Sequence, residues 1–116
     1  MQTQWQANKP IYEQLVEQLV AAILEERIAP GQALPSVRQL AGDMQVNPLT
    51  VQRALAQLAE MGVVEKRRGV GSFVSPGARE QLLNQERQRF LEQEWPEIQR
   101  RIKRLDLSLE QLLANQ

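Results

Sequence analysis

The sequence predicts a mainly α-helical protein with one small β-hairpin, arranged as a winged helix-turn-helix domain followed by a helical dimerisation tail. Three observations predict this fold. Helix-start signals at Ser36 and Asn47 open two short amphipathic segments that are separated by a tight turn. The segment "GVVEKRRGVGSFVSPG" places β-favouring pairs on either side of two glycines. After residue 77 the composition changes to Glu, Gln, Arg and Leu. We therefore expect the domain over residues 8–76 and the tail over residues 78–116.

The first helix is expected to begin at Pro10 and to run to about Arg27. Proline is well suited to the first turn of a helix, because its missing N–H would have no helical partner there. Apolar residues then recur at the three- and four-residue spacing of one buried face: Ile11, Leu15, Val16, Leu19, Val20, Ile23 and Leu24. The segment "IAPGQALP" breaks this helix and leaves room only for a short extended piece at residues 32–34.

The second helix begins at Ser36, whose hydroxyl can accept a hydrogen bond from the backbone three residues on. Gln39 is placed for the reciprocal bond of a capping box. The helix should end near residues 45–46, and its inward residues are Leu40, Ala41 and Met44.

The third helix has the clearest start signal, because Asn47 can cap it and Pro48 occupies its first position. Gly62 should end it. Its expected inner face consists of Val51, Ala54, Leu55 and Leu58, so that Leu49, Thr50, Gln52 and Arg53 remain outside.

A hairpin with a basic, flexible tip follows, with strands around residues 63–64 and 73–74 and the tip at residues 67–71. Residues 75–77, Ser-Pro-Gly, form a linker. In the tail, Leu91, Trp95, Ile98, Ile102 and Leu105 recur at alternating four- and three-residue steps, like a coiled-coil seam of about two heptads. Pro96 predicts a kink or a restart of the helix, and Ser108 should cap a last short helix.

The tail is too short to bury this stripe on itself, so we expect a homodimer seam. Its residues are Leu91, Trp95, Ile98, Ile102, Leu105, Leu109 and Leu112. Two alternatives stay open: the stripe could pack back on the domain in a monomer, and Trp95 could contact a small-molecule effector.

Composition excludes several classes of function. The chain has no Cys and no His, so no Ser-His-Asp or Cys-His arrangement is available and a zinc site would need carboxylates alone. We therefore expect neither an enzyme nor a bound metal or cofactor. No run approaches the roughly 18 apolar residues of a membrane span. The N-terminus lacks the pattern of a secretion signal, so the expected location is cytoplasmic.

Charge is balanced overall, with 14 basic and 14 acidic residues, but it is unevenly distributed. Residues 8–28 are net acidic, whereas residues 36–77 are net basic, so that one side of the domain could face an anion. A helix that enters the major groove of B-DNA meets base edges with its N-terminal residues. Gln52 could pair with an adenine edge or donate to guanine, and Leu49 could touch a thymine methyl group.

Phosphate contacts are expected from the second helix N-terminus, and the hairpin over residues 66–72 is expected to lie on the DNA backbone or in the minor groove. The full set of candidate DNA contacts is Ser36, Arg38, Asn47, Leu49, Thr50, Gln52, Arg53, Arg67, Arg68, Gly69 and Gly71.

Three motifs within residues 10–75 closely resemble the DNA-binding domain of the GntR family of bacterial transcription regulators. They are "PGQALPSVRQLA", "VNPLTVQRALAQL" and "RRGVGSFV". The short tail, ending in "IKRLDLSLEQLL", resembles the YtrA-type branch, whose tails dimerise. The resemblance implies a homodimeric repressor that binds an inverted-repeat operator of double-stranded DNA. The chain departs from the family pattern at Gln45 and Asp106, where glycine is common, and at Leu49, where a polar residue is common.

Two other functions stay open from the sequence. A winged helix can serve protein–protein assembly, in which case the basic hairpin would be incidental. The chain could also be a switch that responds to an unidentified small-molecule effector, which would have to use the tail or the dimer interface.

Overall fold

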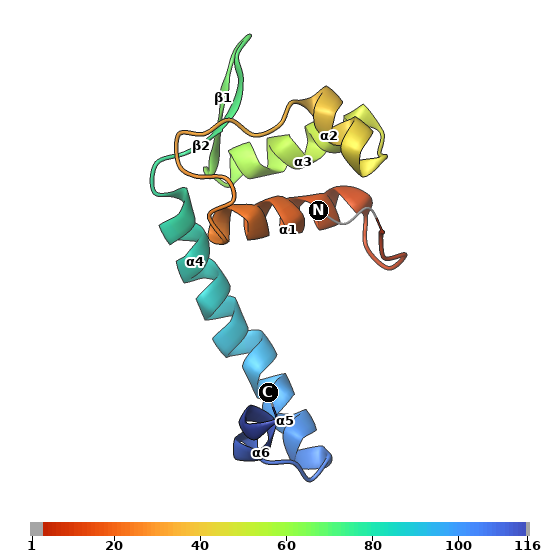
Figure 1. Cartoon of the computed structure of the whole chain (residues 1–116), viewed down its shortest axis with the longest axis vertical. Coiled ribbons are helices and arrows are strands. Elements are labelled where there is room, and N and C mark those ends of the chain that lie inside the picture. The colour runs from red at the N-terminus through yellow and green to blue at the C-terminus, as the bar shows by residue number, and fades with distance from the viewer. Residues whose placement is uncertain (1–3, 116) are drawn as a thin grey trace. The chain divides into compact units, whose positions relative to one another are not determined.

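Three α-helices and a two-stranded antiparallel hairpin form the first of two units in the computed structural model, which describes residues 4–115 (Figure 1). The expected fold class is confirmed. The division between the two units falls between Leu82 and Leu83. The first contains α1 (Ile11–Leu24), α2 (Val37–Met44), α3 (Pro48–Glu60), β1 (Val64–Arg67), β2 (Gly71–Val74) and the start of α4 (Ala78–Arg89). The second contains the rest of α4, a π-helix η1 (Phe90–Glu94), α5 (Trp95–Arg104) and α6 (Leu109–Ala114).

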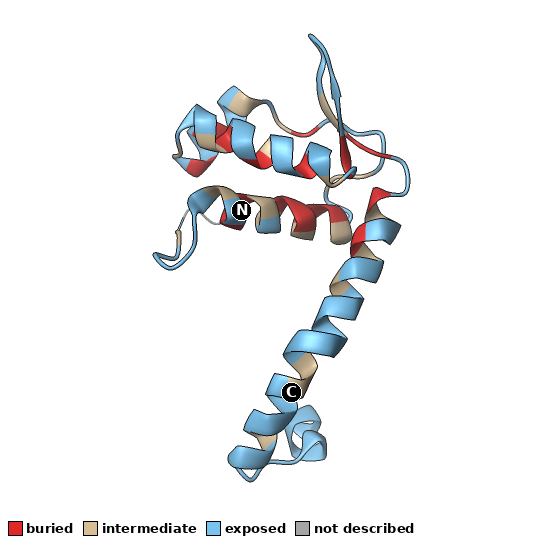
Figure 2. Cartoon of the chain, turned by 180° about the vertical axis from the view of Figure 1, so that it is seen from behind, coloured by how far each residue is buried: buried red, intermediate tan, exposed pale blue. Residues whose placement is uncertain are grey.

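The core of the first unit lies where α1 and α2 pack against α3, as the buried stretches of these helices in Figure 2 indicate. The largest fully buried side chains are Leu15, Leu19, Ile23, Val51, Leu58, Val63, Val74 and Leu82. Ala78 and Leu82 of α4 belong to this core, although the sequence assigned both to the tail. Arg79 also donates from Nε to the Leu24 carbonyl at 2.9 Å, so the first turn of α4 is part of the domain.

Helix α1 is shorter than expected, since it ends at Leu24 and not near Arg27. Glu26 adopts a left-handed backbone with φ of 62°, and the N–H of Arg27 turns back to the Ala22 carbonyl at 2.8 Å. The expected buried stripe is also wrong at Ile11, which is 40% exposed because it lies at the open N-terminal end of the helix.

Helices α2, α3 and α5 end as α1 does: a residue with positive φ is followed by an N–H that donates to the carbonyl five residues earlier. In α3 the residue with positive φ is Gly62, and the N–H of Val63 reaches the Leu58 carbonyl at 3.2 Å. At the ends of α2 and α5 the corresponding residues are Gln45, with φ of 55°, and Asp106, with φ of 57°. A side chain at such a position crowds its own backbone, so these two turns carry local strain that glycine would not.

Replacing Gln45 by glycine is therefore expected to raise the free energy of unfolding by about 0.5–1 kcal/mol. Equilibrium urea unfolding measures it. The matched control is Gln39→Gly, the same substitution at a helical position of α2, which should lower the free energy of unfolding by a similar amount. A Gln45→Gly variant no more stable than the parent would mean that the turn is not strained.

The helix starts follow the sequence signals, although the capping box predicted at Ser36 is only half formed, because the Gln39 side chain makes no bond back to the Ser36 N–H. The Ser36 hydroxyl accepts from the Gln39 N–H at 3.1 Å, and Asn47 Oδ1 accepts from the Leu49 N–H at 2.8 Å. Ser108 forms a complete capping box with Gln111 at the start of α6.

The hairpin, which we call the wing, pairs Val64 with Val74 and Arg67 with Gly71. Arg67 and Gly71 are thus the last pair of the ladder, and only residues 68–70 form the connecting loop. The short extended piece expected at residues 32–34 lies along β2, where the Leu34 N–H donates to the Ser72 carbonyl at 2.8 Å. This third segment fixes the wing to the helical core.

A kink or a restart is expected at Pro96, but the helix does not restart there: α4, η1 and α5 follow one another without a non-helical residue, and a π-helical turn precedes the proline. The Trp95 N–H donates to the Phe90 carbonyl, a bond five residues back along the chain. Because Pro96 has no N–H and its ring crowds the preceding turn, the helix widens into one π-helical turn there, while Glu94 and Trp95 keep helical backbone angles. On the exposed surface of α5, the Arg100 guanidinium donates a hydrogen bond to the Glu97 carboxylate and thereby lowers the pKa of Glu97.

Among the described residues, no helix is long and apolar enough to cross a membrane.

Candidate nucleic-acid interface

The two faces of α3 differ in burial and in chemistry. Val51, Ala54 and Leu58 are completely buried against α1 and α2. On the opposite face Gln52 and Arg53 are exposed, Thr50 is half-buried, and the apolar side chain of Leu49 is 69% exposed. Leu55, expected on the inner face, is only half-buried because it borders the hollow described next.

A hollow of about 540 Å³ lies between the outer side of α3, residues 34–37 and the wing. Ser36, Gln52 and Gly71, three of the predicted contact residues, line it together with Lys66. Ser36 uses its oxygen to cap α2, and its O–H group is left to donate. No carboxylate among the described residues lies within ion-pairing distance of the Lys66 ammonium. The Lys66 ammonium, the Ser36 hydroxyl and the Gln52 amide therefore border this hollow as possible hydrogen-bond donors.

A second hollow, of about 410 Å³, borders the other side of the α3 start. Its lining includes Leu49, Thr50 and Arg53 from α3 and Tyr12 from α1. The guanidinium carbon of Arg53 lies 3.8 Å from the centre of the Tyr12 ring, which is within the range of a cation–π contact. Gln52 and Arg53 are neighbours in sequence, yet they border different hollows.

The wing carries a similar pair, because the guanidinium carbon of Arg67 lies 4.1 Å from the centre of the Phe73 ring. Arg67 is also 4.0 Å from a Glu65 oxygen. Arg68 in the loop is exposed and has no ion pair with any described residue. Val70, beside it, is 69% exposed. The tip of the wing thus presents one unpaired guanidinium and one apolar side chain to solvent.

The remaining predicted contact residues are placed less closely together. Arg38 and Asn47 are exposed but line neither hollow. The side-chain oxygen of Asn47 already accepts the hydrogen bond that caps α3. The predicted contact residues do not include Tyr12, and they include Lys66 only as part of the wing over residues 66–72. Tyr12 has a sequence signal, since it is the only tyrosine and falls outside the apolar stripe of α1. Lys66 has one as well, because it precedes the two arginines of the wing.

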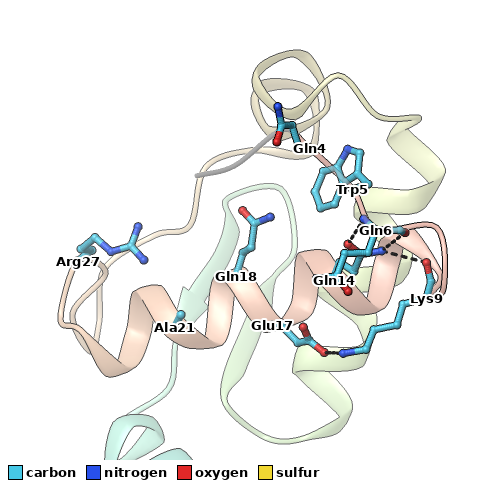
Figure 3. A pocket seen from close by; sticks show the side chains of 9 residues that line it. All are labelled: Gln4, Trp5, Gln6, Lys9, Gln14, Glu17, Gln18, Ala21 and Arg27. Atoms are coloured by element: carbon cyan, nitrogen blue, oxygen red, sulfur yellow. Dashed lines mark hydrogen bonds and ion pairs between the residues drawn. The ribbon is translucent and has the colours of Figure 1, made fainter. Parts of the chain in front are cut away.

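A further hollow, of about 620 Å³, lies along α1 beneath the segment that precedes it (Figure 3). The buried Gln14 holds that segment by accepting from the Gln6 N–H and donating to the Gln6 and Lys9 carbonyls, at 2.8 to 2.9 Å. At its rim Lys9 pairs with Glu17 at 2.6 Å. These polar groups are already bonded to one another, so we assign them to attachment of the N-terminal segment.

The second unit has an apolar surface but no core of its own, because none of its described residues is buried. Of the predicted seam, Leu91 and Leu105 are each 60% exposed, and Ile98 is 36% exposed. Trp95 and Ile102 are half-buried, and Phe90 stacks on Trp95 with ring centres 6.3 Å apart. Phe90, Leu107 and Leu113 are exposed as well, and the sequence did not place them in the seam.

Within the described part of the chain, no group of three or more Asp and Glu residues is arranged to hold a metal ion.

Comparison with known proteins places this geometry in a family. The family model described as "Bacterial regulatory proteins, gntR family" matches residues 11–74. The chain is 33% identical to the HTH-type transcriptional regulator YhcF of Bacillus subtilis over 113 residues, which cover 97% of this chain and 92% of YhcF. It is 39% identical to the HTH-type transcriptional repressor YtrA of the same organism over 77 residues, which cover 66% of this chain and 59% of YtrA.

Solved structures of GntR-type proteins are similar to this chain as well. A GntR family transcriptional regulator from Listeria monocytogenes superposes with a TM-score of 0.77 at 31% identity, covering 95% of each chain. AraR(DBD) in complex with operator ORX1 superposes with a TM-score of 0.57 at 26% identity, covering 65% of this chain and 92% of AraR(DBD).

Proposed function

This chain belongs to the GntR family of bacterial regulatory proteins and is a DNA-binding transcription regulator of that family, and on this premise we propose that it acts as a homodimeric repressor of an inverted-repeat operator. The observation that carries the proposal is the division of α3 into a fully buried back and a polar, exposed start. An anchored helix with a free N-terminal end is the element that winged-helix proteins insert into the major groove.

Base contacts are assigned to Leu49 and Gln52. Both are exposed near the start of α3. Neither side chain makes a hydrogen bond or ion pair with a described residue, so none has to break on binding; the Leu49 N–H keeps its cap bond to Asn47. The Gln52 amide can donate and accept at once, which matches an adenine edge, and Leu49 can contact a thymine methyl group.

Backbone contacts are assigned to the groups around these two residues. One strand would run through the hollow between α3 and the wing, where Lys66 and the Ser36 hydroxyl meet its phosphates. Arg68 at the wing tip, with Gly69 beside it, would lie on the backbone or in the minor groove. Arg38, Asn47, Thr50, Arg53, Arg67 and Gly71 complete the proposed contact set.

Dimerisation is assigned to residues 83–115. Their apolar side chains remain exposed in a single chain, and an exposed apolar surface of this kind is typical of an interface. A second copy would cover the seam through a two-fold axis, and a two-fold symmetric dimer matches an inverted repeat.

Selection of bound sequences from random DNA duplexes tests the proposal as a whole. We expect a two-fold symmetric consensus whose half-sites are about 34 Å or a multiple of it apart, and an affinity that falls steeply as salt rises. A protein–protein assembly module would enrich no sequence, and its binding to duplex DNA would be weak at every salt concentration.

Arg68→Ala is expected to weaken operator binding uniformly across sequences and to lower the slope of log Kd against log salt by about one, because one phosphate contact is lost. Fluorescence anisotropy over a salt series measures both. The charge-matched control is Arg27→Ala, an exposed arginine near the end of α1, which should change neither value. Gln52→Ala should instead leave the salt slope intact and relax the preference at one base pair. An unchanged slope for Arg68→Ala would remove the wing tip from the contact set.

A further inference from the structure

The position of Arg53 poses a question that its charge alone does not answer. Arginine has a long, flexible side chain, and on an exposed helix it loses that freedom when it binds a phosphate. Arg53 is exposed, and no described carboxylate pairs with it. Its guanidinium nevertheless has a defined place, 3.8 Å from the centre of the Tyr12 ring.

Stacking on a ring restrains a guanidinium without using its hydrogen-bond donors. The ring attracts the cation through its face, while the five N–H groups of the guanidinium point outward in the guanidinium plane. Arg53 can therefore remain on Tyr12 and still donate two parallel bonds to a phosphate. The ring also shields one face of the cation from water.

The aromatic ring, and not the hydroxyl, is the part of Tyr12 that serves this purpose. The Tyr12 hydroxyl lies 3.3 Å from a carboxylate oxygen of Glu13 and donates to it. A hydroxyl beside a carboxylate is a poor partner for a second anion, because the two negative charges repel. The half-buried ring and the guanidinium stacked on it line the hollow that Leu49 and Thr50 also border.

We propose that Tyr12 of α1 is a positioning residue for DNA binding, which holds the guanidinium of Arg53 in place to receive a backbone phosphate beside the start of α3. This inference rests on the proposed function and adds to it a residue outside the helix-turn-helix and the wing. It also divides the outer face of α3, since Gln52 borders the hollow on the wing side and Arg53 the one on the α1 side.

A measurement without DNA tests the contact itself. A proton near the face of an aromatic ring has a shifted resonance, so the Arg53 Nε–H signal in the nuclear magnetic resonance spectrum should be displaced in the parent protein. It should stay displaced in Tyr12→Phe and return to the ordinary arginine range in Tyr12→Leu. An ordinary Arg53 signal in the parent would overturn the inference.

Binding to the selected operator tests the role. Tyr12→Leu is expected to weaken binding about threefold, whereas Tyr12→Phe stays within about twofold of the parent. Arg53→Ala should weaken binding further and lower the salt slope by about one. The double variant Tyr12→Leu/Arg53→Ala should bind no more weakly than Arg53→Ala, because Tyr12 acts through Arg53. Thermal unfolding of each variant checks the fold, and Tyr12→Met repeats the test if Tyr12→Leu does not fold.

Other outcomes overturn the inference in distinguishable ways. A Tyr12→Phe variant as weak as Tyr12→Leu would make the hydroxyl a direct contact. Additive losses in the double variant would make Tyr12 independent of Arg53, and tighter binding by Tyr12→Leu would mean that the ring keeps Arg53 away from DNA. If the parent binds duplex DNA and Arg53→Ala changes nothing, only this inference fails. If the parent does not bind duplex DNA, the proposed function fails with it.

Discussion

Ile98→Glu is expected to convert the protein into a monomer of 13.3 kDa and to weaken operator binding about a hundredfold or more. Ile98 of α5 lies in the middle of the proposed seam, where a second copy would bury it, and an unpaired carboxylate is costly to bury. A monomer would meet one half-site at a time, so the gain from simultaneous contact with both half-sites is lost. Analytical ultracentrifugation gives the mass, and anisotropy with the selected operator gives the affinity.

Two controls separate the seam from a general effect of charge. Gln99→Glu adds the same charge at the next, polar position, and Ile98→Leu keeps the apolar side chain; both variants should remain dimeric. A parent that sediments as a single chain at micromolar concentration would contradict the dimer. A dimeric Ile98→Glu variant would place the interface elsewhere.

Leu58→Ala is expected to lower the free energy of unfolding by about 3 kcal/mol. Leu58 is fully buried on the back of α3, so the shorter side chain leaves a cavity in the core of the first unit. Because folded domains are stable by only about 5–15 kcal/mol, this loss removes a large part of the total. Urea unfolding at equilibrium measures it.

The exposed Gln57 next to Leu58 supplies the control, since Gln57→Ala should change the free energy of unfolding by less than about 0.5 kcal/mol. Under conditions where Leu58→Ala is folded, its operator affinity should stay near that of the parent, because Leu49, Gln52 and Arg53 are untouched. A loss of stability below about 1 kcal/mol would indicate that α3 is not anchored through Leu58.

Local signals account for much of what could be predicted from the sequence. Asn47 and Pro48 start α3, Ser108 starts α6 and Gly62 ends α3, because each of these residues acts on the backbone within a few positions of itself. The period of the apolar residues identifies the buried back of α3 for the same reason. The hairpin follows from its glycines and the β-favouring pairs beside them.

Errors arose where a distant contact or an unusual backbone decides. The sequence predicts the end of α1 about three residues too late, because nothing in the composition marks Glu26 as a residue with positive φ. The change of composition after residue 77 predicts that Ala78 and Leu82 belong to the tail, since their apolar character does not tell which unit covers them. The π-helical turn before Pro96 has no sequence signal beyond the proline itself.

The sequence by itself determined the order of helices, the wing and the polar start of the third helix, since these depend on residues close together in the chain. Only the tertiary structure decided that Tyr12 meets Arg53 and that Ser36, Gln52 and Lys66 surround one hollow. Packing of α1 and the wing around α3 brings these residues together, and neither hydrophobic period nor helix capping encodes a meeting between side chains so far apart in the chain.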